Sequence, residues 1–241
     1  MLLSIVIPAY NEAACLGETL VNLDRARALL DSNDDTQTEI IVVDNDSDDA
    51  TAEVARACGA TVAFEKQHNV AEVRNSGARV AHGDVLVFVD ADIVVPVQLL
   101  ARIAETMSDA TCLGGAVDTH YRPQKIVVRV YLEGWRILGK LLGMAQGATQ
   151  FCRRDSFMAL KGYDETLFMG EDVDFYWRLR RFATRQNARV VFIKDLKVVP
   201  STRRFDQWQL WRILLWTNPL VVLMFRRRKS CLEGWYRAAP R

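Results

Sequence analysis

The segment Asp84-Val85-Leu86-Val87-Phe88-Val89-Asp90-Ala91-Asp92 is a run of β-branched and aromatic residues that ends in two aspartates one residue apart. This pattern predicts a buried strand that surfaces into a loop. Carboxylates are hard oxygen ligands suited to Mg²⁺ or Mn²⁺, and these ions keep open positions that substrate phosphates fill. We therefore expect a metal and diphosphate site at this strand end. The alternative is that Asp92 caps a helix beginning near Pro96 while Asp90 is solvated.

Strand and helix patterns alternate before this segment. Strands are expected at Leu3–Ile7, Glu39–Val43 and Thr61–Phe64, and helices through Leu16, Leu20 and Leu23, across Val54 and Ala57, and over Val70–Val80, with Gly83 as the stop of the last. Such alternation predicts an α/β fold with parallel pairing and an open doubly wound sheet. The ligand crevice of such a sheet lies at the carboxyl ends of its strands, where the polar clusters of this chain fall.

The second half of the chain is less regular. We expect a helix from Pro96 to about Met107, a strand near Thr111–Thr119, a long helix over Ile126–Met144, a strand at Gly147–Cys152, a turn at Gly162–Asp164 and a helix that begins after Gly170. The 241 residues, 50% of them hydrophobic, can bury one full core. Two independent domains are therefore not expected.

Composition excludes several classes of protein. A net charge of +1 gives no overall electrostatic argument for nucleic acid. The five cysteines are odd in number and form no C-x-x-C pair, so neither a disulfide framework nor a zinc site is expected, and a reducing cytoplasm is the simplest compartment. The first residues lack a basic region and continue into a motif, so they predict a strand and not a signal peptide.

Two further polar residues follow or precede predicted strands. Asp44, at the end of the second strand, is placed to accept hydrogen bonds from a nucleobase or ribose. The alternative is a polar turn in which Asp49 or Ser47 caps the next helix. Arg74, on the helix before the aspartate pair, could neutralise a phosphate or hold an aspartate. Its alternative is a surface ion pair of little energetic value.

Asp172 lies at the start of a predicted helix. A carboxylate there is stabilised by the helix dipole, which keeps it ionised and able to take a proton near neutral pH. The alternative is that Asp172 is the N-terminal cap of that helix. Arg203 and Arg204 follow a turn at Pro200–Thr202 and could reach a diphosphate. A solvated basic pair is the alternative for these two arginines.

These motifs jointly resemble the ordered signature of a family 2 glycosyltransferase with the GT-A fold. The matching segments are Ile5-Val6-Ile7-Pro8-Ala9-Tyr10-Asn11-Glu12, Val42-Val43-Asp44-Asn45-Asp46-Ser47-Asp48-Asp49-Ala50-Thr51, Arg74-Asn75-Ser76-Gly77, Asp90-Ala91-Asp92 and Gly170-Glu171-Asp172. Five motifs in order over about 170 residues make the resemblance specific, whereas one alone would not. The resemblance becomes weaker after about Pro200.

The resemblance implies a nucleotide-sugar donor and assigns roles to residues of this chain. Pro8, Tyr10 and Glu12 would line the base and ribose, and Asp44 would accept a hydrogen bond from the base. Arg74 would be the donor-site arginine. UDP is expected on general grounds only, because no residue selects the nucleotide.

The resemblance also implies the chemistry. Asp90 and Asp92 would bind the ribose and a divalent metal, Mn²⁺ or Mg²⁺, on the diphosphate, and Asp172 would be the general base. That base would deprotonate an acceptor hydroxyl, which attacks the anomeric carbon opposite the leaving group and inverts it. The acceptor could be a glycan, a lipid-linked compound or a small molecule.

This chain departs from the family pattern in three places. Asp46 stands where a glycine is common, and Ala50 replaces another glycine, so the base-binding loop is expected to differ. The Q-x-x-R-W motif of processive relatives is absent, since Trp208–Arg212 has similar letters in another order. We therefore expect a single transfer in each binding event.

The resemblance divides the chain into a catalytic domain at 1–204 and a helical basic tail at 205–241. Within the domain, residues 1–95 would be the nucleotide-binding half and 96–204 the acceptor-binding half. The tail is rich in Trp, Leu and Val, and Arg226-Arg227-Arg228-Lys229 follows. Residues 205–229 thus suit a peripheral contact with an anionic membrane, at the inner face of the plasma membrane. The alternative is an amphipathic helix packed on the core.

Two competing functions fit parts of the pattern. A sugar-phosphate nucleotidyltransferase shares the sheet topology and the metal-bound phosphates, but Asn11-Glu12-Ala13-Ala14 stands where a glycine-rich basic phosphate loop would be expected. A catalytically degenerate nucleotide-binding protein is the other. Asp90, Asp92 and Asp172 together argue against that reading.

Overall fold

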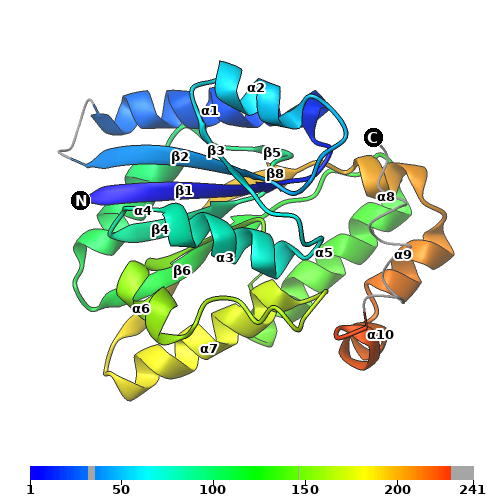
Figure 1. The fold of residues 1–241 in the computed structure, drawn as a ribbon. Coiled ribbons are helices and arrows are strands. Elements are labelled where there is room, and N and C mark those ends of the chain that lie inside the picture. Colours follow the sequence, from blue (N-terminus) through cyan, green and yellow to red (C-terminus); the bar gives the residue numbers. More distant parts are fainter. Residues whose placement is uncertain (32–35, 146, 229–241) are drawn as a thin grey trace.

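The computed structural model describes residues 1–31, 36–145 and 147–228. An eight-stranded sheet in the order β3-β2-β1-β4-β7-β6-β8-β5 runs through the molecule (Figure 1). The strands are β1 (Leu2–Ala9), β2 (Gln37–Asp44), β3 (Thr61–Phe64), β4 (Val85–Val89), β5 (Ile93–Val94), β6 (Cys112–Thr119), β7 (Thr149–Arg153) and β8 (Arg189–Pro200).

Helices cover both faces of this sheet. They are α1 (Ala13–Asp31), α2 (Thr51–Ala57), α3 (Val70–Val80), α4 (Leu99–Ser108), α5 (Ile126–Leu141), α6 (Arg154–Ala159), α7 (Glu171–Arg185), α8 (Arg203–Gln207), α9 (Leu210–Trp216) and α10 (Pro219–Phe225). One core cluster joins the sheet to α1, α2 and α4, and a second joins it to α3, α6 and α7. Figure 1 shows α1 and α2 on one side of the sheet and α3, α6 and α7 on the other.

The first half of the sheet is parallel, as the sequence predicts. β1 pairs in parallel with β2 on one side and with β4 on the other, and β2 pairs in parallel with β3. Every residue of β4 is buried, which explains its unbroken apolar pattern. The expected stop at Gly83 is wrong, because Ala81 caps α3 and the Gly83 N–H donates to Ser4 Oγ at 2.7 Å.

The second half breaks the parallel order at β7. This strand is antiparallel to both β4 and β6, so it brings the segment that precedes it to the carboxyl end of β4. The long β8, which the sequence analysis does not predict, runs parallel to β6 with two shifts of register. Its exposed residues Lys194, Asp195 and Lys197 interrupt the apolar pattern, as is typical of a partly exposed strand. The prediction of a mostly parallel α/β sheet is confirmed.

The tail begins with α8 and α9, which pack against α5. Trp208 and Ile213 are buried with Val128 and Leu132 of α5 in one apolar cluster. The inner face of the tail is thus packed on the domain, whereas Lys229 and residues 230–241 lie outside the described residues. Across the described ranges, no helix is both long enough and apolar enough to span a bilayer.

Candidate active site

A pocket of about 420 Å³ opens at the carboxyl ends of β1 and β4. Its wall contains eight of the nine residues predicted for the site, which are Pro8, Tyr10, Glu12, Arg74, Asp90, Asp92, Asp172 and Arg203. The ninth, Asp44, is not part of the wall, but its neighbour Asn45 is. The fold therefore gathers residues from both halves of the chain around one cavity.

The aspartate pair lies at the end of β4. The Asp92 carboxylate is 3.6 Å from the Arg203 guanidinium, and burial raises the pKa of Asp92 to about 7, with the carboxylates of Asp90 and Glu12 adding to the shift. The helix-cap alternative is wrong, because α4 begins only at Leu99 and its N-cap residue is Gln98. Three carboxylates thus crowd this end of the pocket.

This donor set fits a hard divalent cation. Carboxylate oxygens are the ligands that Mg²⁺ and Mn²⁺ prefer, and a bound cation would relieve the repulsion that disfavours the ionised form of Asp92. Within the part of the chain that the structure describes, no group of three His, Cys, Asp or Glu side chains forms a closed metal cage. A site with two carboxylates leaves coordination positions for water and phosphate oxygens.

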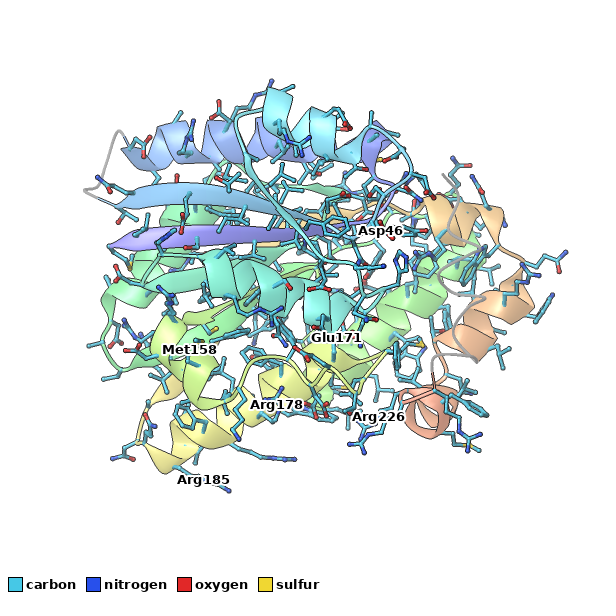
Figure 2. All side chains as sticks on the ribbon, in the orientation of Figure 1. Asp46, Met158, Glu171, Arg178, Arg185 and Arg226 are labelled. Atoms are coloured by element: carbon cyan, nitrogen blue, oxygen red, sulfur yellow. The ribbon has the colours of Figure 1, made fainter. Side chains whose placement is uncertain are left out.

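Arg74 joins the two halves of the pocket. Its side chain is only 4% exposed, and its guanidinium donates to Asp90 Oδ1 at 2.9 Å and to Glu171 Oε1 at 2.7 Å. The surface ion-pair alternative is therefore wrong, and Arg74 holds an aspartate as the sequence analysis proposed. Glu171, labelled in Figure 2, reaches α3 from the start of α7. Sequence reasoning missed its role, although its position beside Asp172 in an acidic first turn was a signal.

The rest of the Arg74-Asn75-Ser76-Gly77 motif holds the backbone around the site. The Asn75 amide donates to the Tyr163 carbonyl at 3.0 Å and to Glu165 Oε1 at 2.8 Å, and its oxygen accepts from the Tyr163 N–H at 2.9 Å. A Cβ atom at Gly77 would overlap the side chain of Val6, so only glycine lets α3 lie this close to β1. The motif therefore fixes the helix that carries Arg74.

Asp172 lies on the first turn of α7 and contacts a distant segment. Its Oδ2 accepts from the Gly147 N–H at 2.6 Å, and its Oδ1 accepts from the Val173 N–H at 2.8 Å. The cap alternative is wrong, because Gly170, with φ of 70°, occupies the N-cap position. A Cβ atom at Gly147 would lie 2.6 Å from Asp172 Cβ, so the close approach needs glycine.

The surroundings of Asp172 raise its affinity for a proton. Burial is the largest cause of the raised pKa, and the Glu171 carboxylate adds to it. Arg74 and the two backbone N–H groups oppose the shift, since they favour the ionised form. A buried carboxylate with a raised pKa is suited to general base catalysis near neutral pH.

The loop after β1 forms another part of the wall. The Tyr10 ring packs edge-on against His68 with centroids 4.8 Å apart. Glu12 Oε2 accepts from Arg203 at 2.6 Å, so the arginine expected at the diphosphate is held here by an acidic residue of the first loop. Asn11 takes a φ of 54°, and its N–H donates to Ser47 Oγ at 3.0 Å. The first and second strand-end loops are thereby joined.

The loop after β2 keeps a glycine-like backbone despite its sequence. Asp46 has a φ of 60°, the left-handed conformation that glycine adopts freely and that Asp tolerates. Asp49 accepts from the Thr51 N–H at 3.0 Å and from the Ala13 N–H at 3.2 Å, as the turn alternative predicts. Asp44 Oδ1 is buried and has no partner among the described residues. The turn and a base-binding role for Asp44 are thus compatible.

Tyr121 is a pocket residue that the sequence analysis missed. It follows β6 in no recognisable motif, yet it lines the pocket and its ring packs edge-on against Phe205 with centroids 5.6 Å apart. Burial and the nearby carboxylates of Asp90 and Asp172 raise the pKa of its phenol. Tyr121 therefore stays a neutral hydrogen-bonding group beside the two acidic sites.

Comparison with known proteins adds the following similarities. Residues 4–167 match the family model described as Glycosyl transferase family 2. Glycosyltransferase AglE of Haloferax volcanii is 30% identical over 245 residues, which cover 96% of this chain and 73% of that protein. Dolichol-phosphate mannosyltransferase of Pyrococcus furiosus is 29% identical over 147 residues, 59% of this chain and 38% of that protein. The matched part of this chain spans only 24% of the length of validoxylamine A glucosyltransferase of Streptomyces hygroscopicus. It spans 25% of the length of the glycosyltransferase YfnE of Bacillus subtilis.

The fold is also found among solved structures. A mannosyltransferase from Pyrobaculum calidifontis, determined in complex with GDP-Man and Mn²⁺, superposes with a TM-score of 0.65 at 21% identity. The match covers 88% of this chain and 59% of the other. At this identity the likeness concerns the fold.

Proposed function

The chain belongs to glycosyltransferase family 2, and on that basis we propose that it transfers one sugar from a nucleotide sugar to an acceptor hydroxyl, with inversion at the anomeric carbon. The observation that carries the proposal is the meeting of Asp90, Asp92 and Asp172 in the wall of one pocket. A carboxylate pair and a separate proton acceptor are the groups that such a transfer requires.

The donor lies at the carboxyl ends of β1, β2 and β4. Pro8, Tyr10 and Glu12 contact the base and ribose, and Asp44 accepts a hydrogen bond from the base. Asp44 Oδ1 is buried and has no hydrogen-bond partner within residues 1–31, 36–145 and 147–228. This supports the role, because a buried acceptor without a donor costs free energy. A divalent cation held by Asp90 and Asp92 would supply charge stabilisation to the leaving diphosphate.

Asp172 removes the acceptor proton. As its carboxylate takes the hydroxyl proton, the acceptor oxygen forms a bond to the anomeric carbon. The bond from that carbon to the diphosphate oxygen breaks, and its electron pair leaves with the nucleoside diphosphate. The Gly147 and Val173 N–H groups keep the carboxylate in place through this step. Arg203 adds positive charge at the diphosphate end of the pocket.

The acceptor we propose is a lipid-linked compound that receives a single sugar. The Pyrococcus relative, named for dolichol phosphate, supports a lipid in this class of acceptor. The absence of the Q-x-x-R-W order supports one transfer in each binding event. The family membership disfavours the nucleotidyltransferase alternative.

A thermal-shift screen of UDP-, GDP- and dTDP-sugars, with and without Mn²⁺, tests this function. A donor at about 100 times its Kd should stabilise the protein by about 2.7 kcal/mol. The Mn²⁺-dependent part of the shift should vanish in Asp92→Ala and persist in Asp48→Ala, which removes an exposed carboxylate of the β2 loop. The absence of any shift with every donor, or an unchanged Mn²⁺-dependent shift in Asp92→Ala, would refute the proposal.

A further inference from the structure

α5 carries apolar side chains on two sides. Val128 and Leu132 face the domain and are buried against Trp208 and Ile213. Six other apolar residues of the same helix are exposed, and they are Ile126 (71%), Val127 (59%), Val130 (68%), Ile137 (52%), Leu138 (42%) and Leu141 (79%). At about 100° per residue, these six fall within an arc of about 120°. They form one continuous stripe along the outside of the helix, which we call the α5 stripe.

An exposed stripe of this kind indicates an interaction surface. An ordinary surface helix buries its single apolar stripe and presents polar residues to solvent. Contiguous exposed apolar patches mark sites that contact a protein or a membrane. The α5 stripe is therefore the face of the helix that the domain itself leaves uncovered.

The apolar surface continues on α9. The two helices lie side by side in Figure 1, and the hydroxyls of Tyr131 and Thr217 are hydrogen-bonded at 2.6 Å. On α9, Trp211 is 56% exposed, and Leu214 and Leu215 are each 42% exposed. The two helices together give a broad surface that contains an exposed tryptophan.

Positive charge gathers on the same two segments. Residues 122–142 contain five Lys and Arg against one Glu, and residues 203–228 contain six Arg against one Asp, which gives net charges of +4 and +5. Because the whole chain has a net charge of +1, the remaining residues carry −8. Arg136 and Lys140 pair with Asp118, and Arg203 pairs with Glu12 in the pocket. The exposed cations of the two segments are Arg122, Lys125, Arg129, Arg212, Arg227 and Arg228.

The positive charge beside the α5 stripe favours an anionic partner. Two copies of the chain that met through the α5 stripe would bring their cations together, which like-charge repulsion disfavours. An anionic lipid surface offers apolar depth for the stripe and negative headgroups for the cations around it. Amphipathic helices with aromatic and aliphatic residues on one face and cations beside it are typical of this setting.

We propose that the α5 stripe and the outer face of α9 rest on an anionic lipid membrane. Phe205 of α8 lines the pocket and also packs against the buried cluster on the inner face of α5, so the α5 helix lies close to the pocket. A lipid-linked acceptor would then reach Asp172 from the bilayer. That last step rests on the proposed function, whereas membrane binding does not.

Vesicle flotation of the full chain tests the proposal. Wild-type protein should float with vesicles of phosphatidylcholine and phosphatidylglycerol and remain unbound with phosphatidylcholine alone. The double variant Val130→Glu with Leu141→Glu should bind on the order of 100-fold more weakly, since each change removes apolar burial. The matched control is Val21→Glu with Val80→Glu, which adds the same charge at positions 47% and 44% exposed on α1 and α3. It should keep most of the binding.

Two outcomes would overturn the proposal. The first is that wild-type protein does not bind anionic vesicles. The same result is expected if another segment of the chain covers the stripe. The second is equal binding of the stripe and control variants. Sedimentation equilibrium is run in parallel, because a dimer that only the stripe variant abolishes, without vesicle binding, would assign the face to a second copy. No donor is present in these assays, so their failure is separate from failure of the donor screen.

Discussion

The two halves of the catalytic domain build the pocket in different ways. In residues 1–95, which we propose as the donor half, the polar pocket residues other than Arg74 follow parallel strands that lie next to one another in the sheet. In residues 96–204, which we propose as the acceptor half, the pocket is lined by the loop before β7, the start of α7 and α8. The donor half is thus a row of strand ends, and the acceptor half is an assembly of distant segments.

The difference separates two kinds of chemistry. A row of strand ends gives a fixed edge that suits binding of the nucleotide and its diphosphate. The proposed acceptor half would supply the proton acceptor, Asp172, and Arg74 connects it to the proposed donor half through Asp90 and Glu171. We infer that binding of the donor and transfer of the sugar can be altered separately, except at Arg74.

Asp172→Asn should give the largest difference between its effect on sugar transfer and its effect on donor binding. Transfer should fall by about 10²- to 10⁴-fold, because the amide cannot take the acceptor proton. Donor affinity, measured by calorimetry, should stay near the wild-type value. The control is Asp174→Asn on the same turn, whose carboxylate pairs with Arg178 and does not line the pocket. Near-wild-type turnover in Asp172→Asn would refute its role as the base.

Arg74→Met should destabilise both halves together, because Arg74 pairs with one carboxylate from each. The change leaves the carboxylates of Asp90 and Glu171 without their buried cation, which should lower the free energy of unfolding by about 3–5 kcal/mol. Urea denaturation measures this loss. Arg79→Met, on the same helix but 55% exposed, should change stability by about 1 kcal/mol or less. Equal losses in the two variants would show that Arg74 does not join the halves.

Gly147→Ala should slow sugar transfer without weakening donor binding. The new Cβ atom would lie 2.6 Å from Asp172 Cβ and must displace that carboxylate. A displacement near 1 Å should lower the transfer rate on the order of 100-fold. The donor-induced thermal shift should persist. Gly134→Ala on α5 is the control and should keep full activity, because no atom of the part of the chain that the structure describes lies within 4 Å of the added Cβ.

The pH dependence of transfer gives the smallest effect. Because burial raises the pKa of Asp172 to about 7, its basic form should be lost as the pH falls through that value. An ordinary aspartate would stay ionised down to about pH 4. With saturating donor and Mn²⁺, the rate should therefore fall about tenfold for each pH unit below about 7. A rate that stays constant down to pH 5 would contradict this environment for Asp172.

The residues that the sequence located best belong to short segments beside regular strands. The ranges of β3 and α3 are confirmed to the residue, and β4 is confirmed as a fully buried strand that precedes Asp90. The sequence pattern did not predict β8, because its apolar pattern is interrupted and its register shifts twice. It also missed Tyr121 and the role of Glu171. Glu171 acts through Arg74, a residue 97 positions away.

The sequence by itself determined the row of parallel strand ends in residues 1–95. Parallel strands that follow one another along the chain place their carboxyl ends at one edge, so a motif after each strand is enough to locate the site. Only the tertiary structure decided how the acceptor half meets it. The antiparallel β7 places Gly147 against Asp172, and the Arg74 ion pairs hold α7 beside β4. The same packing buries one face of α5 and leaves the other exposed, because burial depends on neighbours that no local pattern records.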